Sequence, residues 1–265
     1  MMKKCSIAEL SSRTNLSEYK IKRFETGAEF QKLKDLSIIS KSLEVSLDFL
    51  FEQHVAIDVV KLRKNKISGK DRLAAIEMAR YASRGPIFLL KHFKMDIFKP
   101  FPCQKIDNSE AREIGKLIAK EWSDGSPLAL ILENKGIVLV KIPSDTSLFH
   151  GLFMINDGVP VIALNKTRDS KKEMLEDIAH ELGHAVFMNQ KFDERQEEAL
   201  CDLFADGFSE EFIKINGFNI GDFDFLERKT RDAWLDDLIT MSRAAELLEV
   251  SIETIRERIN DEWLQ

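Results

Sequence analysis

The sequence predicts an α+β fold, and three observations support that prediction. Three short apolar runs have the aliphatic content of buried strands: residues 136–143, 151–156 and 158–165. The pair Asp157-Gly158 joins the last two runs and favours a tight hairpin. Residues 171–190 and 194–215 then have apolar positions spaced by three and four, which is the periodicity of a helix. We therefore expect a small, mostly antiparallel sheet that is followed by two long helices.

The composition limits the kinds of protein that this chain can be. With 265 residues, of which 44% are hydrophobic, it can bury one or two sizeable cores. A formal net charge of −6 argues against a nucleic-acid-binding surface that extends over the whole chain. Its three cysteines, Cys5, Cys103 and Cys201, form no CxxC pair and indicate neither a disulfide framework nor a cysteine zinc site. Because we find no export signal and no membrane-spanning run, we expect a cytoplasmic protein without a membrane partner.

Changes in composition divide the chain into four segments. Residues 6–51 read as short helices with tight turns, and residues 55–95 read as helical with a break at Gly85-Pro86. Two prolines in the stretch that follows mark a linker, and Asn108 or Ser109 could cap the helix behind it. The expected segments are 1–54, an all-α module; 55–104, a helical connector; 105–215, the α+β domain; and 216–265, a helical pair with Ser242 as a cap.

The stretch DIAHELGHAVF, residues 177–187, carries the most specific chemical signal. His180 and His184 are four apart and project from one face of a helix, where their ring nitrogens could bind one metal ion. The following helix adds Glu198, with Asp202 one turn later on the same face. Two imidazoles and one carboxylate are the ligands of an open catalytic zinc site. The alternative is an amphipathic helix with two packed histidines, followed by a solvated acidic face.

The neighbouring residues have the chemistry that zinc-dependent hydrolysis needs. Three protein ligands leave one position on the ion for water, and Glu181 could take a proton from that water and deliver it to the leaving amine. Asp202 could accept a hydrogen bond from a ligand histidine and so fix its tautomer. Glu197 is the alternative to Glu198 as the third ligand. Gly183, between the histidines, suggests that backbone or substrate comes close there.

Four blocks of the sequence together resemble the ImmA/IrrE metallopeptidases, over residues 109–212. The blocks are GKLIAKEWSDGSPLALILENKGIVLVKIP, GVPVIALN, EDIAHELGHAVF and EEALCDLFA, in the order that the family has. The resemblance implies a zincin-like endopeptidase domain, in which the two HExxH histidines and Glu198 hold Zn²⁺ and Glu181 is the catalytic glutamate. The sequence departs from the family at Cys201, where alanine is usual, and it lacks the family's Met-Pro end to this helix.

The amino-terminal segment resembles a Xre/Cro-type helix-turn-helix over residues 10–51, with LSEYKIKRFETG in the place of the recognition helix. The first helix of that family would precede Ser6, and we expect it to be missing. Four side chains are candidates for contacts with bases or phosphates: Tyr19, Lys20, Lys22 and Arg23. We expect DNA binding to be weak and sensitive to salt, because Glu18 lies beside these residues. A helical module that docks onto protein is the alternative.

Two further features lie on either side of the motif. His150, just before the run 151–156, could stabilise an oxyanion, although packing against the neighbouring aromatic residues is the alternative. Residues 239–261 read as a helix, a turn and a helix. Three glutamates lie where phosphates would lie in a DNA complex, so a helical lid is the better interpretation: Glu246, Glu249 and Glu253.

The resemblance favours an endopeptidase that cuts a regulatory protein inside the cell. Its expected substrate is a helix-turn-helix repressor or an antitoxin-like protein, whose cleavage would change the transcription of the target genes. The alternative comes from another class of protein. It is a DNA-binding regulator or antitoxin in which the metal site is structural or vestigial.

Overall fold

The computed structural model describes residues 5–25, 32–43, 59–62, 69–100, 106–142, 150–167, 170–259 and 263. The chain divides into two compact units, Met1–Val55 and Ala56–Gln265. Residues 101–105, where the sequence suggested a boundary, lie outside the described ranges. None of the described helices is long and apolar enough to cross a membrane.

The amino-terminal unit contains three described helices, α1 (Ile7–Thr14), α2 (Glu18–Glu25) and α3 (Leu33–Leu43). Helix α1 begins with a capping box, because the Ser6 side chain accepts from the backbone of Glu9 while the Glu9 side chain accepts from the backbone of Ser6. Four apolar side chains from the three helices form a small core: Leu10, Ile21, Phe24 and Ile39. The expected short helices are therefore present.

The second unit is built on a four-stranded sheet with the order β1-β3-β4-β2. Its strands are β1 (Val59–Leu62), β2 (Val138–Ile142), β3 (Gly151–Asn156) and β4 (Val159–Asn165). Strand β3 pairs antiparallel with both β1 and β4, and β2 pairs parallel with β4. The expected hairpin is confirmed, since Asp157 and Gly158 both have the positive φ that a tight turn requires. The sheet is mixed, with two of its three pairings antiparallel.

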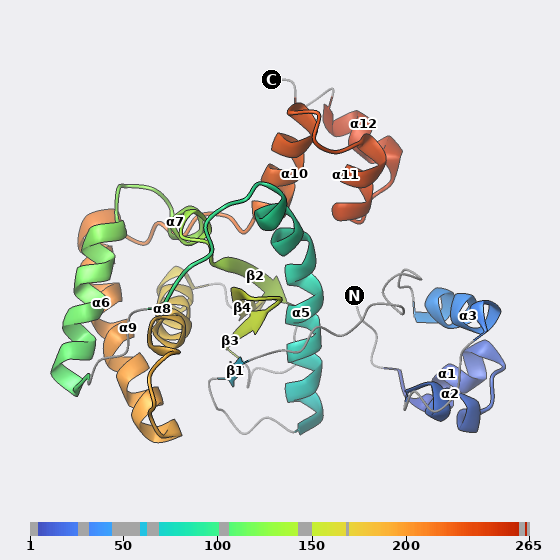
Figure 1. Ribbon diagram of the computed structural model, residues 1–265, viewed down its shortest axis with the longest axis horizontal. Helices are drawn as coiled ribbons and strands as arrows, with labels where there is room; N and C mark the ends of the chain where they lie inside the picture. The colour runs from blue at the N-terminus through green and yellow to red at the C-terminus, as the bar shows by residue number, and fades with distance from the viewer. Residues whose placement is uncertain are drawn as a thin grey trace. The chain divides into compact units, whose positions relative to one another are not determined.

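Helices cover both faces of this sheet (Figure 1). Helix α5 (Gly69–His92) packs on one face, chiefly against β2, and α8 (Lys171–Phe187) packs on the other, against β3 and β4. Helices α6 (Asn108–Trp122) and α9 (Glu194–Asn216) lie together outside α8. Alternate residues of a strand point to opposite faces of a sheet, and here the side chains on both faces are apolar. Strands β3 and β4 are therefore buried along their whole length.

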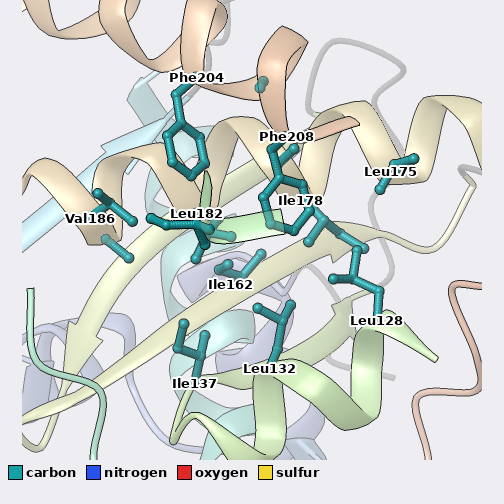
Figure 2. Close-up of a cluster of buried hydrophobic side chains, with 14 of the residues drawn as sticks. Leu128, Leu132, Ile137, Ile162, Leu175, Ile178, Leu182, Val186, Phe204 and Phe208 are labelled. Carbon is teal, nitrogen blue, oxygen red and sulfur yellow. The ribbon is translucent and has the colours of Figure 1, made fainter. Parts of the chain in front are cut away.

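The short helix α7 (Leu128–Asn134), which was not predicted from the sequence, also packs into the core between α8 and the sheet. Figure 2 shows Ile178 and Leu182 of α8 pointing toward Leu132 of α7 and Ile162 of β4. Phe204 and Phe208 of α9 close the same cluster from the far side of α8. This core fixes the helix that carries the HExxH motif.

Two predictions for residues 55–95 were wrong. Residues 59–62 form a strand, because β3 offers a free edge with which the two valines of β1 can pair. Helix α5 continues through Pro86, although proline removes one helical hydrogen bond at a cost of about 3 kcal/mol. Burial of Ile87, Leu89 and Leu90 against the sheet offsets that cost. The segment expected to be a connector therefore belongs to the same unit as the sheet.

Two predicted helix caps also differ from the structure. Asp107 caps α6, accepting from the backbone of Ser109 and Glu110, whereas Asn108 and Ser109 lie inside the helix. Thr240 caps α11 (Met241–Leu247), whereas Ser242 is already helical. In both cases several polar residues at the start of the helix could act as the N-cap, and the backbone geometry selects one of them.

The last part of the chain contains α10 (Phe225–Leu235), α11 and α12 (Ile252–Arg258). The expected pair of helices with an intervening turn is thus present. Its small core consists of Ala244, Ala245, Ile255, Ile259 and Trp263, with Trp234 of α10 packed against it. The Tyr81 hydroxyl of α5 donates to Glu249 after α11, and Arg258 of α12 pairs with Glu227 of α10, so these helices are tied to the rest of the unit.

Candidate metal centre

Helix α8 carries the two histidines of the motif across the sheet. The Ser170 side chain caps its first turn, and the helix continues without interruption to Phe187. His180 and His184 lie one turn apart, with ring centroids separated by 5.1 Å and ring planes at 79°. Both histidines are buried, and the His184 ring stacks on Phe153 of β3. The local periodicity of the helix therefore places both imidazoles on one face, as the sequence predicted.

Glu198 of α9 faces the outer nitrogens of both rings. Its carboxylate oxygens lie 3.5 Å from His180 Nε2 and 3.6 Å from His184 Nε2. One ligand atom from each of these three residues falls within 4.8 Å of the other two, as a single ion would require. Burial raises the pKa of Glu198, but its interactions with His180 and His184 more than compensate, so its pKa lies below the ordinary value. The carboxylate is thus in the charged form that binds a cation.

The inner nitrogens of the two histidines contact other carboxylates of α9. His180 Nδ1 lies 2.8 Å from Asp202 Oδ1, and His184 Nδ1 lies 3.0 Å from Glu197 Oε1. An ionised carboxylate only accepts hydrogen bonds, so these contacts favour the tautomers in which Nδ1 carries the proton and Nε2 keeps its lone pair. The contact of Asp202 with a histidine was expected from the sequence. That of Glu197 was not, because Glu197 was expected only as the alternative to Glu198 as the third ligand.

The Glu181 carboxylate lies between α8 and the beginning of β3. Its side chain is fully buried. A Cβ atom on Gly151 would lie 3.0 Å from Glu181 Oε1 and 3.2 Å from its Cγ, so the strand passes directly beside the carboxylate. Glycine at this position leaves room for the Glu181 side chain, which follows His180 in the motif. No pattern in the sequence indicated this role of Gly151.

Helices α8 and α9 approach each other closely at Gly183. A Cβ atom there would lie 3.1 Å from Cys201 Cα and 3.2 Å from Cys201 Sγ. The close approach that the sequence suggested therefore involves the backbone of α9. Burial raises the pKa of the Cys201 thiol well above its ordinary value, and the surrounding carboxylates raise it further. Cys201 is therefore a protonated thiol, unlike the thiolate that binds zinc.

His150 lies next to Gly151 but is not part of the metal cluster. Its Nδ1 lies 3.9 Å from Asp177 Oδ1, and about a quarter of its side chain is exposed. Asp177 is buried on α8, one turn before Glu181. Asp177 and Glu181 are four residues apart and share one face of α8, so His150 lies on the side of α8 that carries Glu181.

The four candidate DNA-binding residues lie in the amino-terminal unit, on α2. Tyr19 and Lys22 are exposed. Lys20 instead forms an ion pair of 2.7 Å with Asp35 of α3, and Arg23 donates to the Tyr19 hydroxyl at 2.9 Å. Asp35 is buried, so Lys20 neutralises a charge inside the unit. This contact reduces the positive surface that the sequence suggested for α2.

These contacts fit a divalent metal ion. Two imidazole Nε2 atoms converge with one carboxylate, and His184 Nε2 is a buried atom with no hydrogen-bond partner among the described residues. A buried nitrogen of this kind normally has a partner, and a metal ion would supply one. Such a ligand set on an HExxH helix, with a buried glutamate beside it, is typical of metallopeptidases.

Comparison with known proteins agrees with this class. Residues 132–260 match the family model of the IrrE N-terminal-like domain, of peptidase family M78. The matched segment extends from α7 to α12 and includes every residue of the candidate metal site. It leaves out residues 1–131, so the helix-turn-helix resemblance of the amino-terminal segment stays a prediction. None of the curated proteins and none of the solved structures matches the chain.

Proposed function

We propose that this chain is a zinc-dependent endopeptidase, with His180, His184 and Glu198 as the zinc ligands. The observation that carries the proposal is the convergence of two Nε2 atoms and one carboxylate of the adjacent helix, 3.5 and 3.6 Å apart. The set of one carboxylate and two neutral imidazoles is typical of hydrolytic zinc sites and leaves a position for water. The match to the IrrE N-terminal-like domain supports the same class.

The residues of the chain have distinct tasks in this reaction. When bound, zinc would act as a Lewis acid that polarises the scissile carbonyl and lowers the pKa of water. Glu181 would take the proton from the attacking water and deliver it to the leaving amine. Its position beside Gly151, where the strand leaves space, supports this role. Asp202 would hold His180 in the tautomer whose Nε2 faces the ion.

His150 is the candidate for a donor to the developing oxyanion. The Asp177 carboxylate lies 3.9 Å from its Nδ1, and the opposite nitrogen, Nε2, could donate to the oxyanion when it carries a proton. The partly exposed side chain would be accessible to a bound peptide. We propose this role for His150 on the strength of its neighbours Gly151 and Asp177.

The substrate that we propose is a regulatory protein, either a helix-turn-helix repressor or an antitoxin-like protein. The resemblance to the ImmA/IrrE peptidases supports this class of substrate, and its cleavage would control transcription. The amino-terminal unit, with its own three-helix core, could hold such a protein or bind DNA weakly. The ion pair between Lys20 and Asp35 favours the protein, because it removes one cation from the surface of α2.

Two variants test the peptidase. We expect about one zinc ion per chain, lost in His184→Ala but kept in Glu181→Gln, because the glutamate is a base and no ligand. Cleavage should fall by about 10²–10⁴-fold in Glu181→Gln, the usual contribution of general base catalysis. Metal analysis of the purified variants, and co-expression with repressors encoded nearby, measure the two effects. Glu176→Gln is the matched control, since it makes the same change at an exposed position of α8.

Two results would contradict this assignment. The first is full zinc occupancy in His184→Ala, which would remove the proposed ligand set. The second is an unchanged phenotype in Glu181→Gln together with a tight and specific shift of promoter DNA. That second result would favour a DNA-binding regulator or antitoxin in which the metal is structural.

A further inference from the structure

We propose that Glu197 is a positioning residue that sets the tautomer of His184 and so directs the Nε2 lone pair of that ring toward the metal. This inference rests on the proposed metal site. It concerns a residue that takes no part in binding the ion itself. Glu197 precedes the proposed ligand Glu198, so neighbouring carboxylates on one helix would have different tasks.

The two carboxylates face opposite sides of the same imidazole. Glu197 Oε1 lies 3.0 Å from His184 Nδ1, whereas Glu198 Oε1 lies 3.6 Å from His184 Nε2. An ion held by Nε2 of both histidines is therefore on the Glu198 side. Glu197 takes the place that a hydrogen-bond acceptor has behind a metal-binding histidine.

Burial makes the contact between Glu197 and His184 stronger than the matching contact at the other histidine. His184 is fully buried and only 11% of the Glu197 side chain is exposed, whereas 60% of the Asp202 side chain is exposed. A buried carboxylate is costly unless it accepts hydrogen bonds, and a charge-assisted bond is worth more where water is excluded. We therefore expect Glu197 to control its histidine more firmly than Asp202 controls His180.

A second group competes for the same nitrogen. Cys201 Sγ lies 3.4 Å from His184 Nδ1. If Nδ1 had no proton, the thiol could donate to it, and Nε2 would then carry the proton and could not bind a metal. The Glu197 carboxylate is the better partner, because it is charged, whereas a thiol forms only weak hydrogen bonds. Glu197 thus selects the productive tautomer over the alternative that Cys201 offers.

The test measures the tautomer directly in the full-length, metal-free protein. Nitrogen-15 NMR distinguishes Nδ1–H from Nε2–H, and the chain has only five histidines. At a pH where the ring is neutral, we expect the Nδ1–H form at His184 in the wild type and a shift toward Nε2–H in Glu197→Ala. Glu197→Gln keeps an acceptor oxygen and should preserve the wild-type tautomer. Asp206→Ala is the matched control, because it removes an exposed carboxylate from the same helix.

Zinc affinity gives a second readout that is independent of activity. Competition with a chelator should show affinity reduced by about 10–100-fold in Glu197→Ala, which is the usual effect of removing such a partner. Affinity should be close to the wild-type value in Glu197→Gln, in Asp206→Ala and in Cys201→Ala. Loss of Glu198 should instead abolish binding, since a ligand is removed.

The outcomes separate this inference from the proposed function. An unchanged His184 tautomer in Glu197→Ala overturns the positioning role, even if the protein is an active peptidase. Abolished zinc binding in Glu197→Ala with normal binding in Glu198→Ala also overturns it and makes Glu197 the ligand. A shifted tautomer with weakened zinc binding supports it, even if no peptide is ever cleaved.

Discussion

Glu133 and Arg228 show how a single buried charge depends on its partner. The Glu133 side chain on α7 is almost fully buried, and Arg228 of α10 donates to it at 2.5 Å. Burial raises the pKa of Glu133 above its ordinary value of 4.5, although the charge of Arg228 opposes this. Because the folded-state pKa is the higher one, the contribution of Glu133 to stability is greatest below pH 4.5 and decreases as the pH rises through the folded-state pKa.

We therefore predict that Arg228→Ala destabilises the protein in a pH-dependent way. At neutral pH the loss should be about 3 kcal/mol, because an unpaired carboxylate remains buried. The difference from the wild type should shrink as the pH falls and Glu133 becomes protonated. Urea unfolding at several pH values measures both effects. Arg231→Ala, on the same helix with 39% of its side chain exposed, is the control and should have little effect. A difference that does not change with pH would contradict this explanation.

Among the described elements, helices α6 and α9 pack closely together, and glycines make their approach possible. A Cβ atom on Gly115 of α6 would lie 2.3 Å from the carbonyl oxygen of Phe204, and one on Gly207 of α9 would lie 2.1 Å from that of Arg112. Neither backbone oxygen can move aside as a flexible side chain would. Since α9 carries Glu197, Glu198 and Asp202, its distance from α6 helps to determine where these carboxylates lie.

The prediction at this scale is that Gly115→Ala destabilises the protein and weakens metal binding. Helix propensity alone would favour alanine by about 1 kcal/mol, whereas overpacking in a core costs about 1–3 kcal/mol. We expect the clash with backbone to prevail, with a net loss of up to about 2 kcal/mol. Thermal unfolding and zinc competition measure the two effects. Leu117→Ala, an exposed position of α6, is the control, and equal stabilities of the two variants would sink the prediction.

For the whole molecule, the arrangement of layers determines which part of the chain can fold alone. One face of the sheet packs on α5 through a cluster that includes Val138, Val140, Leu152 and Met154. Strand β1 covers the edge of β3. A chain that starts at residue 105 lacks both elements and would expose this apolar face to water.

We predict that residues 56–265 fold and bind zinc, whereas residues 105–265 do not form a stable unit. The first range corresponds to one of the two compact units, and the second removes its layer of α5. Circular dichroism, binding of a hydrophobic dye and zinc content compare the two fragments. A cooperative unfolding transition and a full complement of zinc in the fragment 105–265 would show that α5 is dispensable.

Local sequence was sufficient for the features that depend on neighbours along the chain. The HExxH spacing determined that His180 and His184 share one helix face, since residues four apart always do. Asp157-Gly158 determined the hairpin, because its turn requires two residues with positive φ. The apolar runs determined the three strands β2, β3 and β4, and from these the α+β class followed.

Only the tertiary structure decided the features that depend on how elements meet. The pairing of β1 with β3 and the continuation of α5 through Pro86 depend on contacts with the sheet, which no local pattern encodes. Local sequence did not determine the roles of Glu197 and Glu198 either. They differ by about 100° around α9, and the rotation of α9 against α8 decides which of them faces Nδ1 and which faces Nε2 of His184. That rotation is set by close packing at Gly183 and Gly115, between residues far apart in the chain.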